Sequence, residues 1–223
     1  MPPRCCGNMH IPPNVVVHNK TKIYMRHSYM KNLLLIIVLV LGIYNSTDAM
    51  MNTDSVKVCN TVSIFFKWYI TAIKDSAYDE FKPKFSENKH GMTTLDYNKY
   101  IYNLRLYKFS DNLINREIAS YDQCIGSLSK VKYLDFQKTK FTDLDEYEQC
   151  GCDFGNYYRW IGGQEICDGI LIRKTDFSNK DECIVTIEKY DLNEEGKYFF
   201  WSYYVTVRLE KIGDTWKIDN IEL

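Results

Sequence analysis

The spacing of the apolar residues changes along this chain, and the change limits the folds open to it. Over residues 58–73, apolar side chains recur every three or four positions, which is the spacing of one helix face. Over residues 205–210 they alternate with polar ones, so Val205 and Val207 face one way and Arg208 the other, as in a half-buried strand. Because the helical pattern precedes the strand pattern, we expect an α+β domain.

Three helices are predicted in the first part of this pattern. They span residues 54–76, 93–109 and 110–131. Thr93 or Thr94 is available to cap the second helix, and Ser110 to cap the third. The intervening segment 78–92 carries Pro, Gly and charges and is predicted to be a loop or a short helical turn.

Four strands are predicted after a polar connection. They come from residues 165–177 and 182–192, and from two runs on either side of Gly213 and Asp214. Short turns between consecutive strands imply an antiparallel meander. We therefore expect N-terminal helices packed on one face of an antiparallel sheet.

The longest apolar run, residues 33–43, has eleven residues, whereas a membrane-spanning helix needs about 20. Lys31 precedes the run, and small polar residues follow it up to Ala49, in the order of a secretory signal. No cysteine stands at that boundary to accept a lipid. We therefore expect residues 30–49 to be a signal peptide cleaved after Ala49, with no membrane span in the mature chain.

This prediction divides the chain into three parts, which are residues 1–29, the signal peptide 30–49 and residues 50–223. Residues 1–29 precede Met30, have no periodic apolar pattern, and are expected to be a disordered upstream extension or the result of a mis-assigned start. Residues 50–223 are expected to form a single α+β domain. The product is then a soluble protein of the periplasm or the cell exterior.

Removing residues 1–49 makes the chain more acidic. That segment holds five of the 28 basic residues and one of the 29 acidic ones, which leaves 23 and 28, a net charge of −5. Nucleic acid is therefore not an expected partner. Of the four histidines only His90 remains, and one histidine cannot build a multi-histidine metal site. We predict no metal and no cofactor.

Six cysteines remain in the mature chain, and an exported protein can pair them as disulfides. They are Cys59, Cys124, Cys150, Cys152, Cys167 and Cys183. Six cysteines allow 15 full pairings. Cys59 and Cys124 fall on separate predicted helices and are our first candidates for a bridge. The spacing around "CGC" lacks the C-x-x-C pairs of zinc and redox sites, which favours disulfides or buried thiols.

The segment 153–169 is the most unusual in composition, because it gathers polar groups and an aromatic ring around two glycines. The candidate ligand- or partner-binding residues are Arg159, Trp160, Gln164, Glu165 and Asp168. They are predicted either to hold a small molecule or a partner side chain, or to form a turn with the ring in the core and the charges in solvent. The acidic run 143–148 fails the spacing of a calcium loop and is predicted to face a partner.

The ending "YYVTVRLEKIGDTWKIDNIEL" resembles the last hairpin of the nuclear-transport-factor-2-like superfamily, also called cystatin-like or ketosteroid-isomerase-like. The stretch "FFKWYITAI" is similar to the first helix of exported bacterial proteins of unknown function in that superfamily. The resemblance implies a cone, in which a curved sheet wraps helices around a pocket. The superfamily shares no catalytic set, so the resemblance assigns no catalytic residue here.

Two classes of function are carried forward, beside a structural role in the envelope. The first is an exported, noncatalytic binding module for an unknown protein or small molecule, such as an immunity-type protein. The alternative is an isomerase, dehydratase or hydrolase with a carboxylate and a tyrosine in the cone. Asp168 with Tyr203 or Tyr204 is the pair considered for it. The sequence does not specify the oligomeric state.

Overall fold

The apolar stripe of the first predicted helix is the buried face of a long helix over residues 53–74. The computed structural model describes residues 53–138, 151–152, 158–163 and 165–223. The predicted signal peptide with Ala49, the leading segment 1–29 and the acidic run 143–148 lie outside the described residues. The helix covers the region of the predicted stripe, and its row from Val58 to Ile73 is buried.

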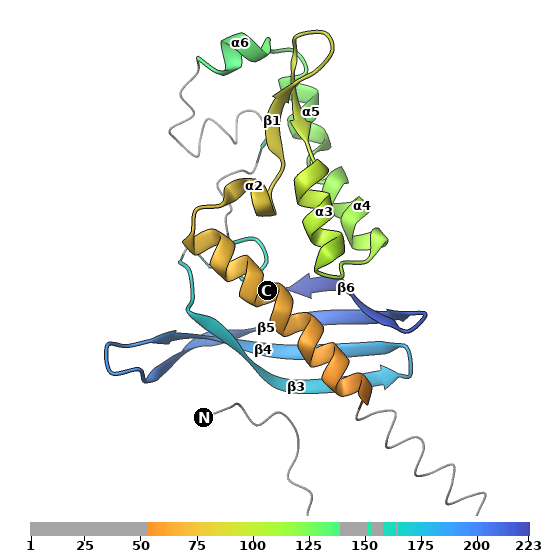
Figure 1. The fold of residues 1–223 in the computed structure, drawn as a ribbon, viewed down its shortest axis with the longest axis vertical. Helices are drawn as coiled ribbons and strands as arrows, with labels where there is room; N and C mark the ends of the chain where they lie inside the picture. The colour runs from red at the N-terminus through yellow and green to blue at the C-terminus, as the bar shows by residue number, and fades with distance from the viewer. Residues whose placement is uncertain (1–52, 139–150, 153–157, 164) are drawn as a thin grey trace, which may run out of the picture. The chain divides into compact units, whose positions relative to one another are not determined.

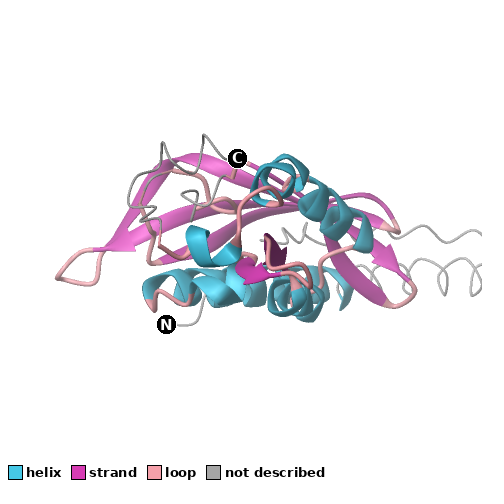
Figure 2. Cartoon of the chain, turned by 90° about the horizontal axis from the view of Figure 1, so that it is seen from above, coloured by secondary structure: helices cyan, strands magenta, loops and turns pink. Residues whose placement is uncertain are grey.

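Four antiparallel strands in the order β3-β4-β5-β6 form the main sheet, which confirms the predicted meander (Figure 1). They are β3 Gly169–Asn179, β4 Glu182–Leu192, β5 Tyr198–Ile212 and β6 Thr215–Glu222. Val205, Val207 and Leu209 are all buried, as their alternation predicted. Figure 2 shows the sheet as a curved layer that is not closed. With the helices this is an α+β fold.

Several shorter helices follow the first one along the chain. They are α2 Tyr78–Phe81, α3 Asn98–Leu106, α4 Asp111–Ala119, α5 Asp122–Leu128 and α6 Tyr133–Phe136. Ser110 caps α4 as predicted, because its hydroxyl accepts a hydrogen bond from the Leu113 N–H at 3.0 Å. The single helix expected over 110–131 is wrong, since the chain turns at Ser120 and Tyr121 between α4 and α5.

A small hairpin, β1 Lys84–Glu87 with β2 Thr93–Asp96, replaces the loop and the helix start that were predicted there. Thr93 does not cap a helix. Its N–H and its hydroxyl both donate to the Val131 carbonyl, at 2.8 and 2.9 Å. The α-helix begins only after Tyr97, because the preceding residues pair as strands.

The helical part and the sheet share one core, because buried residues of the first helix and of β4, β5 and β6 belong to a single cluster. The Phe65 and Phe109 rings meet at 4.8 Å in an edge-on contact. Backbone hydrogen bonds join the turn after α3 to β6: the Ile218 N–H donates to the Lys108 carbonyl, and the Ser110 N–H to the Ile218 carbonyl. The region before α4 is therefore held against the last strand of the sheet.

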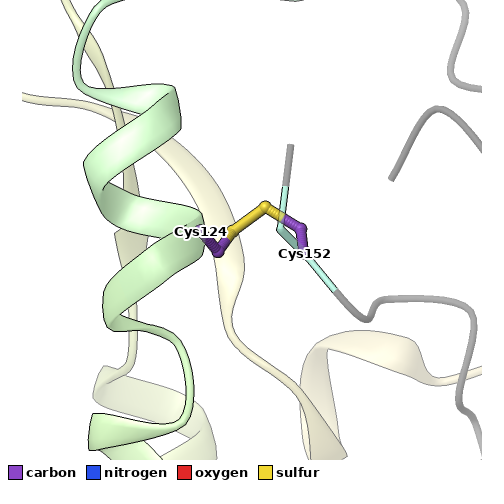
Figure 3. The surroundings of a disulfide bond; sticks show 2 residues. All are labelled: Cys124 and Cys152. Carbon is purple, nitrogen blue, oxygen red and sulfur yellow. A yellow bond between two sulfur atoms is a disulfide. The ribbon is translucent and has the colours of Figure 1, made fainter. Parts of the chain in front are cut away.

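The predicted Cys59–Cys124 bridge is wrong. Cys124 on α5 is bonded to Cys152, with 4.6 Å between their Cα atoms (Figure 3). Cys59 lies on the first helix, where its sulfur is 3.6 Å from the Thr175 hydroxyl of β3. Cys59 therefore packs against the sheet, whereas Cys124 is bonded to Cys152 in the segment that precedes the sheet.

Candidate functional site: a groove beside the first helix

An open groove of about 760 Å³ runs along the first helix. One wall is the face of that helix that carries Ile64 and Trp68, continued by Asp75 in the turn after the helix, and the other is formed by Leu106 and Tyr107 at the end of α3. Ile64 and Trp68 are four positions apart on the helix, so they share a face away from the buried row. We call this the helix groove.

The floor of the helix groove is aromatic. Trp68 stacks on Tyr107, with ring centroids 4.2 Å apart and planes inclined by 17°. Ile64 and Leu106 are more than half exposed at its rim. Exposed aliphatic side chains beside a stacked aromatic pair form a surface that gains free energy when a partner covers it.

The far end of the groove is fixed by a polar contact between α2 and α3. The Asn103 amide donates to the Glu80 carbonyl at 2.9 Å and to its carboxylate at 2.7 Å. Lys99 also bonds the Glu80 carboxylate, which lowers the pKa of that group. Glu80 therefore stays negative and engaged within the protein.

The two remaining charges of the groove have opposite sign and lie toward opposite ends. Both line it: Lys67 lies on the first helix and Asp75 in the turn just after Lys74, the last residue of that helix, so about 10 Å of helix axis separates Lys67 from the helix end. Both side chains are exposed. A partner that fits this groove would therefore place an acidic group near Lys67 and a basic group near Asp75.

A smaller groove of about 380 Å³ lies on the adjacent face of the helix, against β3 and β4, and shares Lys67 and Thr71 with the helix groove. It contains Asp168, one of the predicted binding residues. The Asp168 carboxylate pairs with Lys74 at 2.6 Å and accepts the Leu192 N–H at 2.8 Å. The bond to Lys74 is the main reason why the pKa of Asp168 is lowered.

The other predicted residues do not join Asp168 in one site. Arg159 pairs with Glu117, and its guanidinium carbon lies 5.3 Å from the centre of the Trp160 ring. Trp160 is itself buried, with its ring edge-on to Phe109. Glu165 is exposed, and Gln164 lies outside the described residues. The sequence segment is thus divided between a core contact and a groove.

Glu117 on α4 is a buried carboxylate that was not predicted from the sequence. Glu117 is 2% exposed, accepts the Tyr100 hydroxyl at 2.7 Å and lies 2.6 Å from the Arg159 guanidinium. Burial raises the pKa of Glu117 against the opposing effect of Arg159. Glu117 stands three residues after Ile114 and four before Tyr121, so it lies on the apolar face of its helix. This position could have predicted from the sequence that Glu117 is buried.

A second buried charge lies on β4. Lys189 is fully buried, and its ammonium donates to the carbonyls of Ile161 and Gly162 and lies over the rings of Trp201 and Tyr203. Burial lowers its pKa to about 8. These contacts tie the loop at 158–163 to the sheet.

Within the part of the chain that the structure describes, no three His, Cys, Asp or Glu side chains are grouped as a metal site would need. No helix among the same residues has the length and apolar character required to cross a membrane.

Comparisons with known proteins give no relative. No protein-family model, no curated protein and no solved structure matches this chain significantly. The function must therefore be argued from the site itself.

Proposed function

We propose that this protein is an exported, noncatalytic binding module that holds a segment of another protein in the helix groove. The observation that carries the proposal is the open groove with the stacked Trp68 and Tyr107 at its floor and exposed Ile64 and Leu106 at its rim. Small-molecule sites enclose most of their ligand, whereas an open groove between helices suits a polypeptide with apolar anchors.

The charges of the groove define the chemistry of the partner. The bound segment carries apolar side chains for the centre, an acidic residue for Lys67 and a basic residue for Asp75. About 10 Å of helix separates Lys67 from the helix end beside Asp75, which corresponds to about two turns of a helical segment. An immunity-type protein that blocks a toxin or a wall-cleaving enzyme is one form of this function.

Export to the periplasm or the cell exterior is part of the proposal. It rests on the signal-like residues 30–49, and the Cys124–Cys152 disulfide supports it, since such bonds persist in oxidising compartments. Membership of the nuclear-transport-factor-2-like superfamily also remains a proposal, supported by the curved antiparallel sheet and its helices.

The enzyme alternative has less support. Glu165 is exposed, and Asp168 is held by Lys74 with a lowered pKa, which does not suit a general base in a pocket. Glu117 and Tyr100 do form a buried carboxylate–tyrosine pair, but neither residue lines either groove. We therefore carry only the binding function forward.

Selection of displayed 15-residue peptides on the purified protein tests the proposal. We expect enriched peptides to combine apolar residues at helical spacing with one acidic and one basic residue. Ile64→Glu puts an unpaired charge at the rim of the groove and should weaken their binding by roughly tenfold or more, the effect of about 1.4 kcal/mol.

Leu134→Glu is the matched control, because Leu134 is also an exposed aliphatic residue but lies on α6 and does not line the groove. It should leave peptide binding unchanged. Both variants should keep the wild-type circular dichroism spectrum. Failure to enrich any peptide, or equal binding of the enriched peptides to both variants, would contradict the proposal.

A further inference from the structure

Two buried thiols lie close together where the first helix packs on the main sheet. Cys59 is on that helix and is 8% exposed, and Cys183, near the start of β4, is fully buried. Neither is part of the Cys124–Cys152 disulfide, and both carry a thiol. Neither lines the helix groove, so the proposed binding function gives them no role.

The strand register places Cys183 beside the point where Cys59 meets the sheet. The Cys59 sulfur is 3.6 Å from the Thr175 hydroxyl oxygen on β3. Thr175 is opposite Val185 on β4, and the pairing from there to Cys183 is regular. Residues two apart on a strand share a face, so Cys183 is the diagonal neighbour of Thr175 on the same face. Such neighbours have Cα atoms about 7–8 Å apart and Cβ atoms closer together.

The two thiols are also close enough for one to act on the other electrostatically. Burial, and after it the neighbouring Cys59, raise the pKa of Cys183 to about 12. Only a thiolate attacks a disulfide, so Cys183 reacts slowly near neutral pH while the helix stays packed on the sheet. Without an added oxidant, therefore, Cys124 and Cys152 are the bonded pair among the described cysteines.

We propose that a disulfide oxidant joins Cys59 and Cys183 in a second disulfide, which fastens the first helix to β4. The Cys59 thiolate attacks one sulfur of the oxidant and releases the other as a thiol. The Cys183 thiolate then attacks the Cys59 sulfur of this mixed disulfide and releases the second thiol. The oxidant thus takes up the two electrons and two protons that the cysteines lose. This bond goes beyond the proposed binding function and does not depend on it.

Cys167 provides the matched control, because it is also fully buried and also carries a thiol. It lies two residues before β3, whose first residue, Gly169, is paired with Tyr190. Cys183 is at the opposite end of this strand pair. Replacing Cys167 should therefore leave the bond between Cys59 and Cys183 intact.

Peptide mapping after oxidative refolding tests the pairing, because unfolding exposes both thiols to the oxidant. The protein is unfolded in urea with dithiothreitol, refolded with reduced and oxidised glutathione, alkylated with iodoacetamide and digested with trypsin. Cleavage after lysine gives peptides 58–67 and 181–189, each with one cysteine. We expect these two peptides to be joined, with a mass two hydrogens below the sum of the separate peptides, and to separate on reduction.

Cys59→Ser should remove the joined peptides and leave peptide 181–189 alkylated, whereas Cys167→Ser should keep them joined. The proposal would be overturned by refolded wild type that has the native circular dichroism spectrum but carries Cys59 and Cys183 alkylated or capped by glutathione. A bond from either of them to a different cysteine as the main product would overturn it as well.

Discussion

Replacing Arg159 with methionine is expected to lower the free energy of unfolding by about 3 kcal/mol at pH 7. Arg159 is the cation that neutralises Glu117, whose side chain is almost fully buried on α4. Tyr100 continues to donate a hydrogen bond to the carboxylate, but a hydrogen bond does not cancel the charge. Urea unfolding followed by fluorescence measures the loss.

The loss should depend on pH in a defined direction. Burial raises the pKa of Glu117 in the folded protein, so the folded state holds its proton more tightly than the unfolded state. The associated stabilisation is complete below the unfolded value of about 4.3 and is lost as the pH rises through the folded pKa. Without Arg159 that folded pKa rises further, so the variant should regain stability as the pH falls from 7 toward 5.

Arg105→Met provides the control for this prediction. Arg105 pairs with Asp111 at 3.7 Å, and both side chains are largely exposed. Surface pairs of this kind contribute about 0–1 kcal/mol. A loss after Arg159→Met that is no larger than this, or that does not change between pH 7 and pH 5, would show that Glu117 is not a buried charge balanced by Arg159.

Reduction of the Cys124–Cys152 disulfide is expected to lower the free energy of unfolding by about 3.5 kcal/mol. The bond joins residues 28 positions apart, and the loop-closure entropy for that length gives this value at 25 °C. It fastens the segment at 151–152 to α5, which itself adjoins β2. Urea unfolding with and without dithiothreitol measures the effect.

The double variant Cys124→Ala with Cys152→Ala separates this bond from the other thiols. It should unfold at the lower urea concentration of the reduced wild type, and dithiothreitol should cause no further change. If dithiothreitol leaves the wild-type midpoint in place, or shifts the double variant equally, the stabilising bond is not the one between these residues.

The sequence predicted helices and strands best where an apolar pattern extends over many residues. The stripe at 58–73 spans several helical turns, and the alternation around Val205 covers a strand buried on one face, so both elements follow from periodicity. The hairpin β1–β2 was missed because each strand has four residues, too few for a period to show. Thr93 was predicted to cap a helix because Thr is favoured at helix N-caps, but Thr is also favoured in strands.

The helix groove is formed by contacts between residues far apart in the chain, and no local sequence pattern predicts these contacts. Ile64 and Trp68 lie on the outer face of a helix, and they become a groove only because α3 brings Tyr107 against them. The segment with Arg159 and Asp168 stood out by composition, but its charges are directed to Glu117 and Lys74, which are far away in the chain. The prediction of the disulfide pairing was wrong for the same reason, because the spacing of cysteines in the sequence does not show which surfaces meet.

The most direct test of the central claim changes the charge at one end of the helix groove. Asp75→Lys leaves lysines at both ends, whereas Asp214→Lys makes the same change in the exposed turn between β5 and β6. The groove model predicts that peptides selected on the Asp75→Lys variant carry acidic residues at both ends, while those selected on the Asp214→Lys variant keep one acidic and one basic end. Identical peptides from both variants would contradict binding in this groove.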